Sequence, residues 1–190
     1  ISDGTSSGMG DLNRYKKLSL EFPNKKLEYI SLEDYKFNSF WEKLAKLDKN
    51  TPVLLLSAYL DKEGSRMNFN SSLLKIKQHL KAPLYHLWFH GMGGGILGGK
   101  LINHYYQGRS AGKIVLDILN GKNISEISVK IESPNRYFFD YFQLERFNIQ
   151  VSKLPKESVI INRPISFYAD NKTSIWSLIL FIFLLFMIVL

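Results

Sequence analysis

The chain has 190 residues, a formal net charge of +8 and no cysteine, and 45% of its residues are hydrophobic. The lack of cysteine excludes disulfides and thiolate metal sites, and the hydrophobic fraction is enough for a buried core. The lysines are scattered, with no run longer than two, so the charge indicates a solvated basic surface and we expect no nucleic acid partner.

Four short apolar segments alternate with helical patterns over the first ninety residues. The expected strands end at Ser2 and span 27–32, 53–59 and 83–89. Apolar residues at three- and four-residue spacing predict helices between them, over 11–22, over 37–47, and from Asn70 or Ser71 to Leu80. The run VLLLSAY at 53–59 is apolar throughout, which is typical of a strand covered on both faces. This alternation predicts an α/β fold with a parallel sheet and flanking helices.

A glycine-rich segment follows the fourth expected strand. Residues 90–99 (HGMGGGILGG) include six glycines in ten residues, a composition that disfavours a helix or a central strand. We expect a turn or hinge here, with Gly93, Gly94 and Gly95 as the hinge residues.

The pattern after the glycines is less regular. A weak strand pattern over 96–106 is followed by an apolar helical stripe over 108–120, which Gly121 should end. Two further short strands are expected at 129–131 and 159–161, joined by a segment that contains the aromatic run 136–142.

The last segment, 175–190 (IWSLILFIFLLFMIVL), has no charged residue. As a helix it would cover about 24 Å of a hydrocarbon core that is about 30 Å thick. We therefore expect a transmembrane helix that begins near Ile175 and is truncated at Leu190, with 169–174 as a juxtamembrane linker and Trp176 at the polar edge. The alternative is a buried helix of a soluble protein, which would normally keep a polar stripe.

Two nucleotide-binding motifs are incomplete in the glycine-rich segment. A phosphate-binding G-x-x-x-x-G-K pattern ends at Lys100, but Leu101 stands where a hydroxyl side chain is required and no helix is expected to start there. A G-x-G-x-x-G pattern begins at Gly93, yet Asp117, the candidate ribose ligand, falls inside an expected helix. Neither motif predicts a nucleotide site.

Catalytic and metal-binding patterns are also missing from the sequence. The four histidines lack the spacing of a metal site, and no G-x-S-x-G nucleophile motif is present; the histidines are His79, His86, His90 and His104. We therefore predict no metal, no cofactor and no enzymatic activity for this segment.

Several motifs in order along the chain resemble one known family. They are ISDGTSSGMG, VLLLSAYLDKEG, LWFHGMGGGILGGKL, QGRSAGKIVLDILNGKN, ESPNRYFFDYFQLERFNI and LPKESVIINRPISFY. Together with the apolar run, they look like the ABC-transporter substrate-binding-like sensor domain that precedes the membrane helix of many bacterial histidine kinases and diguanylate cyclases. One departure is Phe89, where an acidic residue is expected.

The resemblance implies a type I periplasmic-binding-protein fold, in which two α/β lobes are joined by crossing strands and hold a ligand between them. Residues 1–90 would form the second lobe, and 91–168 the glycine hinge, the crossover strands and a return helix.

The fold alone also indicates where a ligand would bind. Ligands of open α/β sheets sit outside the carboxyl ends of the strands. The candidate residues at these ends are Asp3, Thr5, Ser57, Tyr59, Asp61, Trp88 and His90. Aromatic rings with hydroxyl and carboxylate groups suit a small polar or partly aromatic solute. The alternative role for these residues is ordinary loop capping.

Two functions remain open. The resemblance implies an extracytoplasmic solute sensor in the cytoplasmic membrane, with residues 1–174 outside and lobe closure acting on the membrane helix of a homodimer. A kinase or cyclase would then follow on the cytoplasmic side. The alternative is a membrane-tethered solute-binding component of an ABC transporter. Both functions require a small-molecule solute and a membrane as partners.

Overall fold

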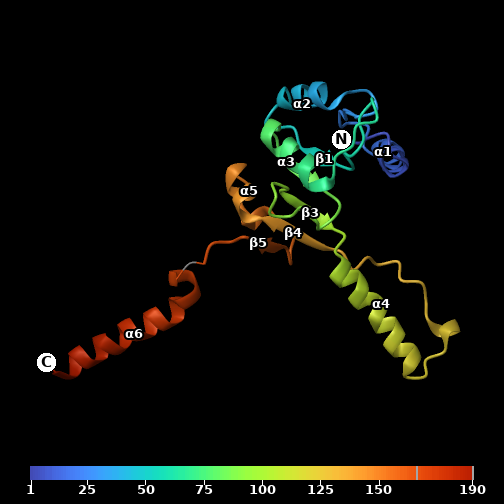
Figure 1. The fold of residues 1–190 in the computed structure, drawn as a ribbon. Coiled ribbons are helices and arrows are strands. Elements are labelled where there is room, and N and C mark those ends of the chain that lie inside the picture. Colours follow the sequence, from blue (N-terminus) through green and yellow to red (C-terminus); the bar gives the residue numbers. More distant parts are fainter. Residues whose placement is uncertain (166, 190) are drawn as a thin grey trace.

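The structure is a computed structural model that describes residues 1–165 and 167–189 (Figure 1). Its helices are α1 (Ser6–Ser19), α2 (Phe37–Ala45), α3 (Phe69–His79), α4 (His104–Leu119), α5 (Tyr141–Arg146) and α6 (Phe167–Val189). Its strands are β1 (Val53–Leu55), β2 (Leu84–His86), β3 (Gly98–Leu101), β4 (Arg136–Asp140) and β5 (Val159–Ile161).

The five strands form one sheet in the order β1-β2-β3-β4-β5. All neighbouring pairs are parallel except β3 and β4, which are antiparallel. The first residues of the chain extend the sheet beyond β1, because Ile1 bonds to Leu54 and Leu56 through its backbone and Ser2 bridges Ser31 in parallel. The predicted α/β fold is confirmed, but the predicted parallel sheet is parallel only in part, because β3 and β4 pair in antiparallel.

Helices α2 and α3 cover one face of this sheet. Phe37, Phe40, Trp41 and Leu44 recur along α2 at the spacing of one helical face, and all four are buried. They pack with Leu73 and Ile76 of α3 and with Val53 and Leu55 of β1 in the main core. Leu54 and Leu56 point to the opposite face, where they line a cavity together with residues of α1. Helix α1 therefore lies on the other side of β1 from α2.

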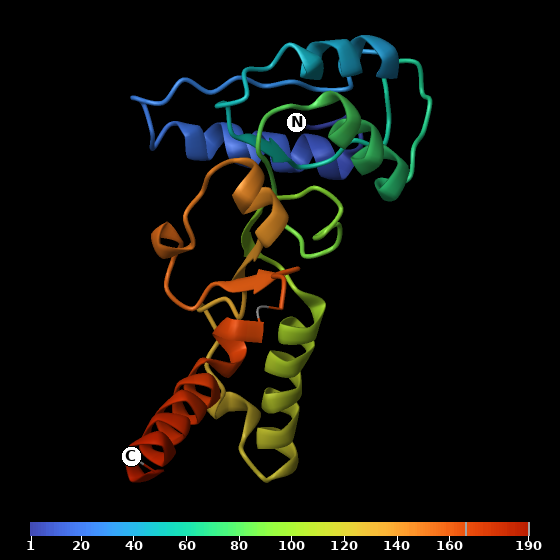
Figure 2. The same ribbon diagram turned by 90° about the vertical axis from the view of Figure 1, so that its left-hand side faces the viewer.

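Strands β4 and β5 and helix α5 form a second, smaller packing unit. Its buried centre consists of Leu97, Phe139 and Leu144. In contrast, α4 and α6 project away from the sheet (Figures 1 and 2). None of residues 104–119, all of which are described, is buried.

Within the described residues, no helix is both long enough and apolar enough to cross a membrane. The predicted transmembrane span at 175–190 is therefore not found among the described residues, which include 175–189 but not Leu190. Helix α6 begins at Phe167, so the predicted linker 169–174 lies inside a helix.

Other predictions need correction at element boundaries. Helix α1 begins before the predicted range 11–22, because Thr5 caps it despite the glycines in its first turns. The cap of α3 is Asn68 rather than Asn70 or Ser71. Gly121 follows α4 with a φ of 93°, as the predicted helix end requires.

Two strand predictions also differ from the structure, and one strand was not predicted. The range 27–32 contributes only the bridge at Ser31. Val129 and Ile131 are fully exposed and lie in no strand, because no described segment pairs with 129–131. The aromatic run 136–142 forms β4 and the start of α5, which the sequence did not predict, because β4 depends on its antiparallel pairing with β3.

Candidate functional site

Asp3 lies fully buried at the carboxyl end of the first extended segment. Its Oδ1 accepts hydrogen bonds from the backbone nitrogen of Thr5 at 3.1 Å and from Thr5 Oγ1 at 2.6 Å. Its Oδ2 accepts from the backbone nitrogen of Tyr59 at 2.6 Å, and its own backbone nitrogen donates to Ser57 Oγ at 3.2 Å. The carboxylate therefore fastens the start of α1 to the loop after β1.

The first turn of α1 packs directly on the side chains of Asp3 and Ser57. Thr5 Oγ1 accepts from the backbone nitrogen of Gly8 at 3.0 Å and so caps the helix. A Cβ atom on Gly8 would lie 2.3 Å from both Asp3 Oδ1 and Ser57 Oγ. Only glycine fits at this position, and the four predicted residues Asp3, Thr5, Ser57 and Tyr59 are brought together.

Asp61 organises a separate loop at the same edge. It accepts backbone hydrogen bonds from Phe37 at 3.1 Å, Glu63 at 3.0 Å and Ser65 at 2.9 Å. Burial raises the pKa of Asp61, but the hydrogen bonds from these backbone N–H groups lower it by more. The pKa of Asp61 therefore lies below its ordinary value. Since Phe37 is the first residue of α2, Asp61 anchors that helix to the loop after β1.

A row of aromatic side chains follows the carboxyl ends of β1 and β2. The ring centroids lie 6.5 Å apart for Tyr59 and Phe69, 4.3 Å for Phe69 and His90, and 6.1 Å for His90 and Trp88. A further 5.8 Å separates Trp88 from His104. We call these five residues the aromatic row. Trp88 is half-buried and His90 exposed, so a solute can reach them.

Two residues of this edge, Phe69 and His86, were not among the predicted site residues. Phe69 is the first residue of α3, and only the packing of that helix places it beside His90. His86 is buried, and its Nδ1 lies 2.8 Å from the carbonyl oxygen of Leu55. Its position four residues before His90 was the only signal in the sequence.

Burial and neighbouring charges shift the pKa values of groups at this edge. Burial lowers the pKa of His86, the Leu55 carbonyl opposes this, and the charge of His90 lowers it again. Burial, and then the charge of Asp3, raise the pKa of Tyr59 above its ordinary value. At neutral pH these shifts favour a neutral imidazole and a protonated phenol.

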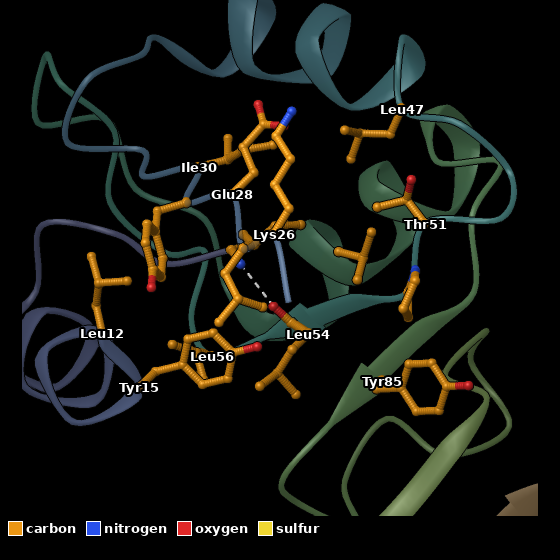
Figure 3. A pocket seen from close by; sticks show the side chains of 15 residues that line it. Leu12, Tyr15, Lys26, Glu28, Ile30, Leu47, Thr51, Leu54, Leu56 and Tyr85 are labelled. Atoms are coloured by element: carbon orange, nitrogen blue, oxygen red, sulfur yellow. Dashed lines mark hydrogen bonds between the residues drawn. The ribbon is translucent and has the colours of Figure 1, made fainter. Parts of the chain in front are cut away.

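A separate cavity lies on the face of β1 to which Leu54 and Leu56 point. It has a volume of about 550 Å³, and none of the predicted site residues lines it. Figure 3 shows Leu12 and Tyr15 of α1 and Leu56 on one side, and Leu47 and Thr51 on the other. The cavity thus occupies the sheet face that α1 only partly covers.

The glycine-rich segment forms turns rather than a phosphate cradle. Gly91, Gly93 and Gly95 have φ values of 87°, 82° and 120°, which favour glycine. Lys100 lies in β3 and Asp117 in α4, so neither is placed for a nucleotide. The hinge role of Gly93, Gly94 and Gly95 stays a prediction. Among the described residues, no group of three or more acidic or histidine side chains could hold a metal ion.

No protein-family model and no curated protein matches the chain. Among solved structures, it is similar to the ligand-free, open structure of CD0873 from Clostridium difficile, a substrate binding protein with adhesive properties. The TM-score is 0.59 at 16% identity, over 86% of this chain and 53% of that chain. A conserved domain protein from Vibrio cholerae gives a TM-score of 0.46 at 16% identity, over 80% of this chain and 50% of that chain.

The chain therefore spans about half the length of the solved structures that it matches, 53% and 50% respectively. At this level of identity, the similarity to CD0873 shows the fold. The predicted resemblance to a substrate-binding protein is therefore confirmed for the fold alone. Neither solved structure bears on a sensor kinase or a cyclase.

Proposed function

We propose that this chain is part of an extracytoplasmic solute-binding domain of the substrate-binding-protein kind. The observation that carries the proposal is the aromatic row, which lies at the carboxyl ends of parallel strands, where open α/β sheets bind ligands. The fold shared with CD0873, a substrate binding protein, supports it.

The residues at this edge divide into two roles. Tyr59, Trp88 and His90 offer rings and polar atoms to a small polar or partly aromatic solute. Asp3 and Asp61 have carboxylate oxygens that already accept hydrogen bonds from the backbone. We assign these two residues to holding the binding edge in shape, which matches the alternative that the sequence left open.

We further propose that the other lobe of a two-lobe protein packs against α4. Val115, Leu116 and Leu119 are exposed on this helix, and Val129 and Ile131 are exposed on the return path to β4. The apolar surface on α4 and on this return segment is suited to pack against another hydrophobic layer. A cleft between two lobes would bind more tightly than this chain alone, since one wall of the site is then supplied by the other lobe.

The proposed solute-binding component is tethered to a membrane through the apolar run 175–190. Large apolar side chains from Leu178 to Met187 are exposed along α6. Reporter fusions at Lys172 and after the apolar run 175–190 test this topology, and they should report opposite sides of the membrane. A cytoplasmic signal at Lys172 would contradict an extracytoplasmic domain.

A sensor is the second candidate function, and one observation favours it. Asn162 Nδ2 donates to Asp140 Oδ2 at 2.6 Å, and a Cβ atom on Gly93 would lie 3.3 Å from the same nitrogen. The glycine-rich segment thus touches the chain shortly before α6. The similarity to CD0873 supports the transport component more than the sensor. A histidine kinase or cyclase output that changes with solute, and loses this response in Asn162→Ala, would favour the sensor.

The solute-binding proposal is tested by a thermal-shift screen of amino acids, nucleosides and small sugars, followed by calorimetry on any hit. Trp88→Ala should weaken binding by about tenfold, as expected for loss of one stacking contact. Leu54→Trp, which fills the cavity on the sheet face next to α1, is the matched control and should bind normally. The reverse result would move the site to the cavity.

A further inference from the structure

His86 has one ring nitrogen that is bonded and one that is not. Its Nδ1 lies 2.8 Å from the Leu55 carbonyl oxygen, and because a carbonyl can only accept, Nδ1 must carry hydrogen. The nitrogen that gains or loses a proton is therefore Nε2. Among the described residues, this buried atom has no hydrogen-bond partner.

A second histidine stands against this ring. The ring centroids of His90 and His86 lie 5.1 Å apart, and the two ring planes make an angle of 89°. The Phe69 ring packs against both histidine rings, with its centroid 5.6 Å from that of His86 and 4.3 Å from that of His90. A Cβ atom on Gly91, the next residue, would lie 2.8 Å from the Phe69 ring. The glycine-rich segment therefore starts in direct contact with α3 through the histidine pair.

The groups that face the pair come from four elements. Strand β1 presents the Leu55 carbonyl, α3 presents Phe69, and the glycine-rich segment presents His90 itself. At the start of α4, the ring centroid of His104 lies 5.8 Å from that of Trp88, which lies 6.1 Å from that of His90. The titratable groups in this set are all histidines, so each added proton increases positive charge. Contact with the Phe69 ring offsets only part of the lost hydration of a buried imidazolium.

We propose that His86 and His90 form a proton-sensitive latch, which holds the glycine-rich segment 90–95 against α3 while both rings are neutral and releases it on protonation. Burial lowers the pKa of His86, and partial loss of hydration lowers the pKa of the more exposed His90; the charge of His90 lowers the pKa of His86 further, and the charge of His104 lowers that of His90. The latch is closed at neutral pH and opens as pH falls below the ordinary histidine value of 6.5. It adds control by acidity to the binding edge and does not depend on the proposed solute function.

Hydrogen exchange of the full chain in detergent micelles tests the latch. Protection factors, corrected for intrinsic exchange, are compared at pH about 7.5 and about 5. We expect protection in 90–95 to fall by about tenfold or more, while α2 changes by less than about twofold. Equal protection of 90–95 at both pH values would overturn the proposal.

Three variants separate the latch from general acid sensitivity. His86→Gln should remove the pH dependence of protection in 90–95. His79→Gln should keep it, because the half-buried His79 of α3 stacks on Trp41 and its Nδ1 lies 2.8 Å from the Lys75 carbonyl oxygen. If His86→Gln does not fold, His90→Gln should reduce the dependence, because it removes the facing charge. Retention of the full dependence in the folded variants would overturn the proposal.

The tautomer gives an independent readout. Nitrogen-15 spectra of the native chain should show His86 with hydrogen on Nδ1 at high pH, and should show Nε2 protonated only below the ordinary histidine value of 6.5. A neutral His86 that carries its hydrogen on Nε2 would overturn the geometry on which the latch rests.

Discussion

The carboxylate of Asp3 accepts a 2.6 Å hydrogen bond from the backbone nitrogen of Tyr59, 56 positions further along the chain. This bond joins the first extended segment to the loop that carries the first ring of the aromatic row. The other carboxylate oxygen holds Thr5 at the start of α1. One buried side chain thus positions two neighbouring parts of the candidate binding edge.

Asp3→Asn should destabilise the protein. The amide nitrogen that replaces one oxygen would face the backbone N–H of Thr5 or of Tyr59. Two buried donors would then point at each other, and one hydrogen bond would be lost. We expect a loss of about 1–3 kcal/mol in the free energy of unfolding, measured by urea titration. Asp11→Asn is the control and should change it by less than about 0.5 kcal/mol, because Asp11 pairs only with the exposed Arg14. Similar effects in both variants would contradict the role of Asp3.

Gly8→Ala and Gly10→Ala should have opposite effects on stability, although both residues lie in α1. A Cβ atom on Gly8 would collide with Asp3 and Ser57, whereas one on Gly10 meets nothing within 4 Å. We expect Gly8→Ala to cost about 1–3 kcal/mol and Gly10→Ala to stabilise by about 0.5–1 kcal/mol. Thermal unfolding of the two variants side by side measures this, and a stabilised Gly8→Ala would show that the helix start is packed differently.

Asp61 should make stability depend on pH in the acid range. Its pKa in the folded protein lies below the ordinary value of 3.8, so the unfolded chain takes up the proton first as pH falls. The stability that Asp61 contributes is therefore present above pH 3.8 and is lost as pH falls through the folded pKa. Urea titrations at a series of pH values should show that the difference between the native protein and Asp61→Asn shrinks below that value. A difference that stays constant down to pH about 2 would contradict this assignment.

The cap of α3 can be tested against the residue that the sequence favoured. Asn68 Oδ1 accepts from the backbone nitrogen of Ser71 at 2.9 Å, and Asn70 lies inside the helix. Asn68→Ala should therefore cost about 1 kcal/mol, whereas Asn70→Ala should be neutral or slightly stabilising. Circular dichroism during thermal unfolding measures both variants. A larger cost at Asn70 would place the start of the helix where the sequence put it.

The sequence by itself determined the fold class and the order of most elements. The alternation of apolar strands with helical stripes is a local property, and it correctly predicted α2, α3, β1, β2 and β5. It also indicated the edge at which Asp3, Thr5, Ser57 and Tyr59 meet, because parallel strands bring their carboxyl ends together.

Only the tertiary structure decided which residues shape that edge and which line it. Sequence spacing could not show that both oxygens of Asp3 are used inside the protein, since their donors belong to Thr5 and to the distant Tyr59. The place of Phe69 depends on how α3 packs against the sheet, and β4 depends on pairing with β3. Local patterns fix the periodicity of an element, but hydrogen bonds and contacts between distant segments fix its neighbours. That is why 129–131, a good strand pattern with no described pairing partner, is not a strand.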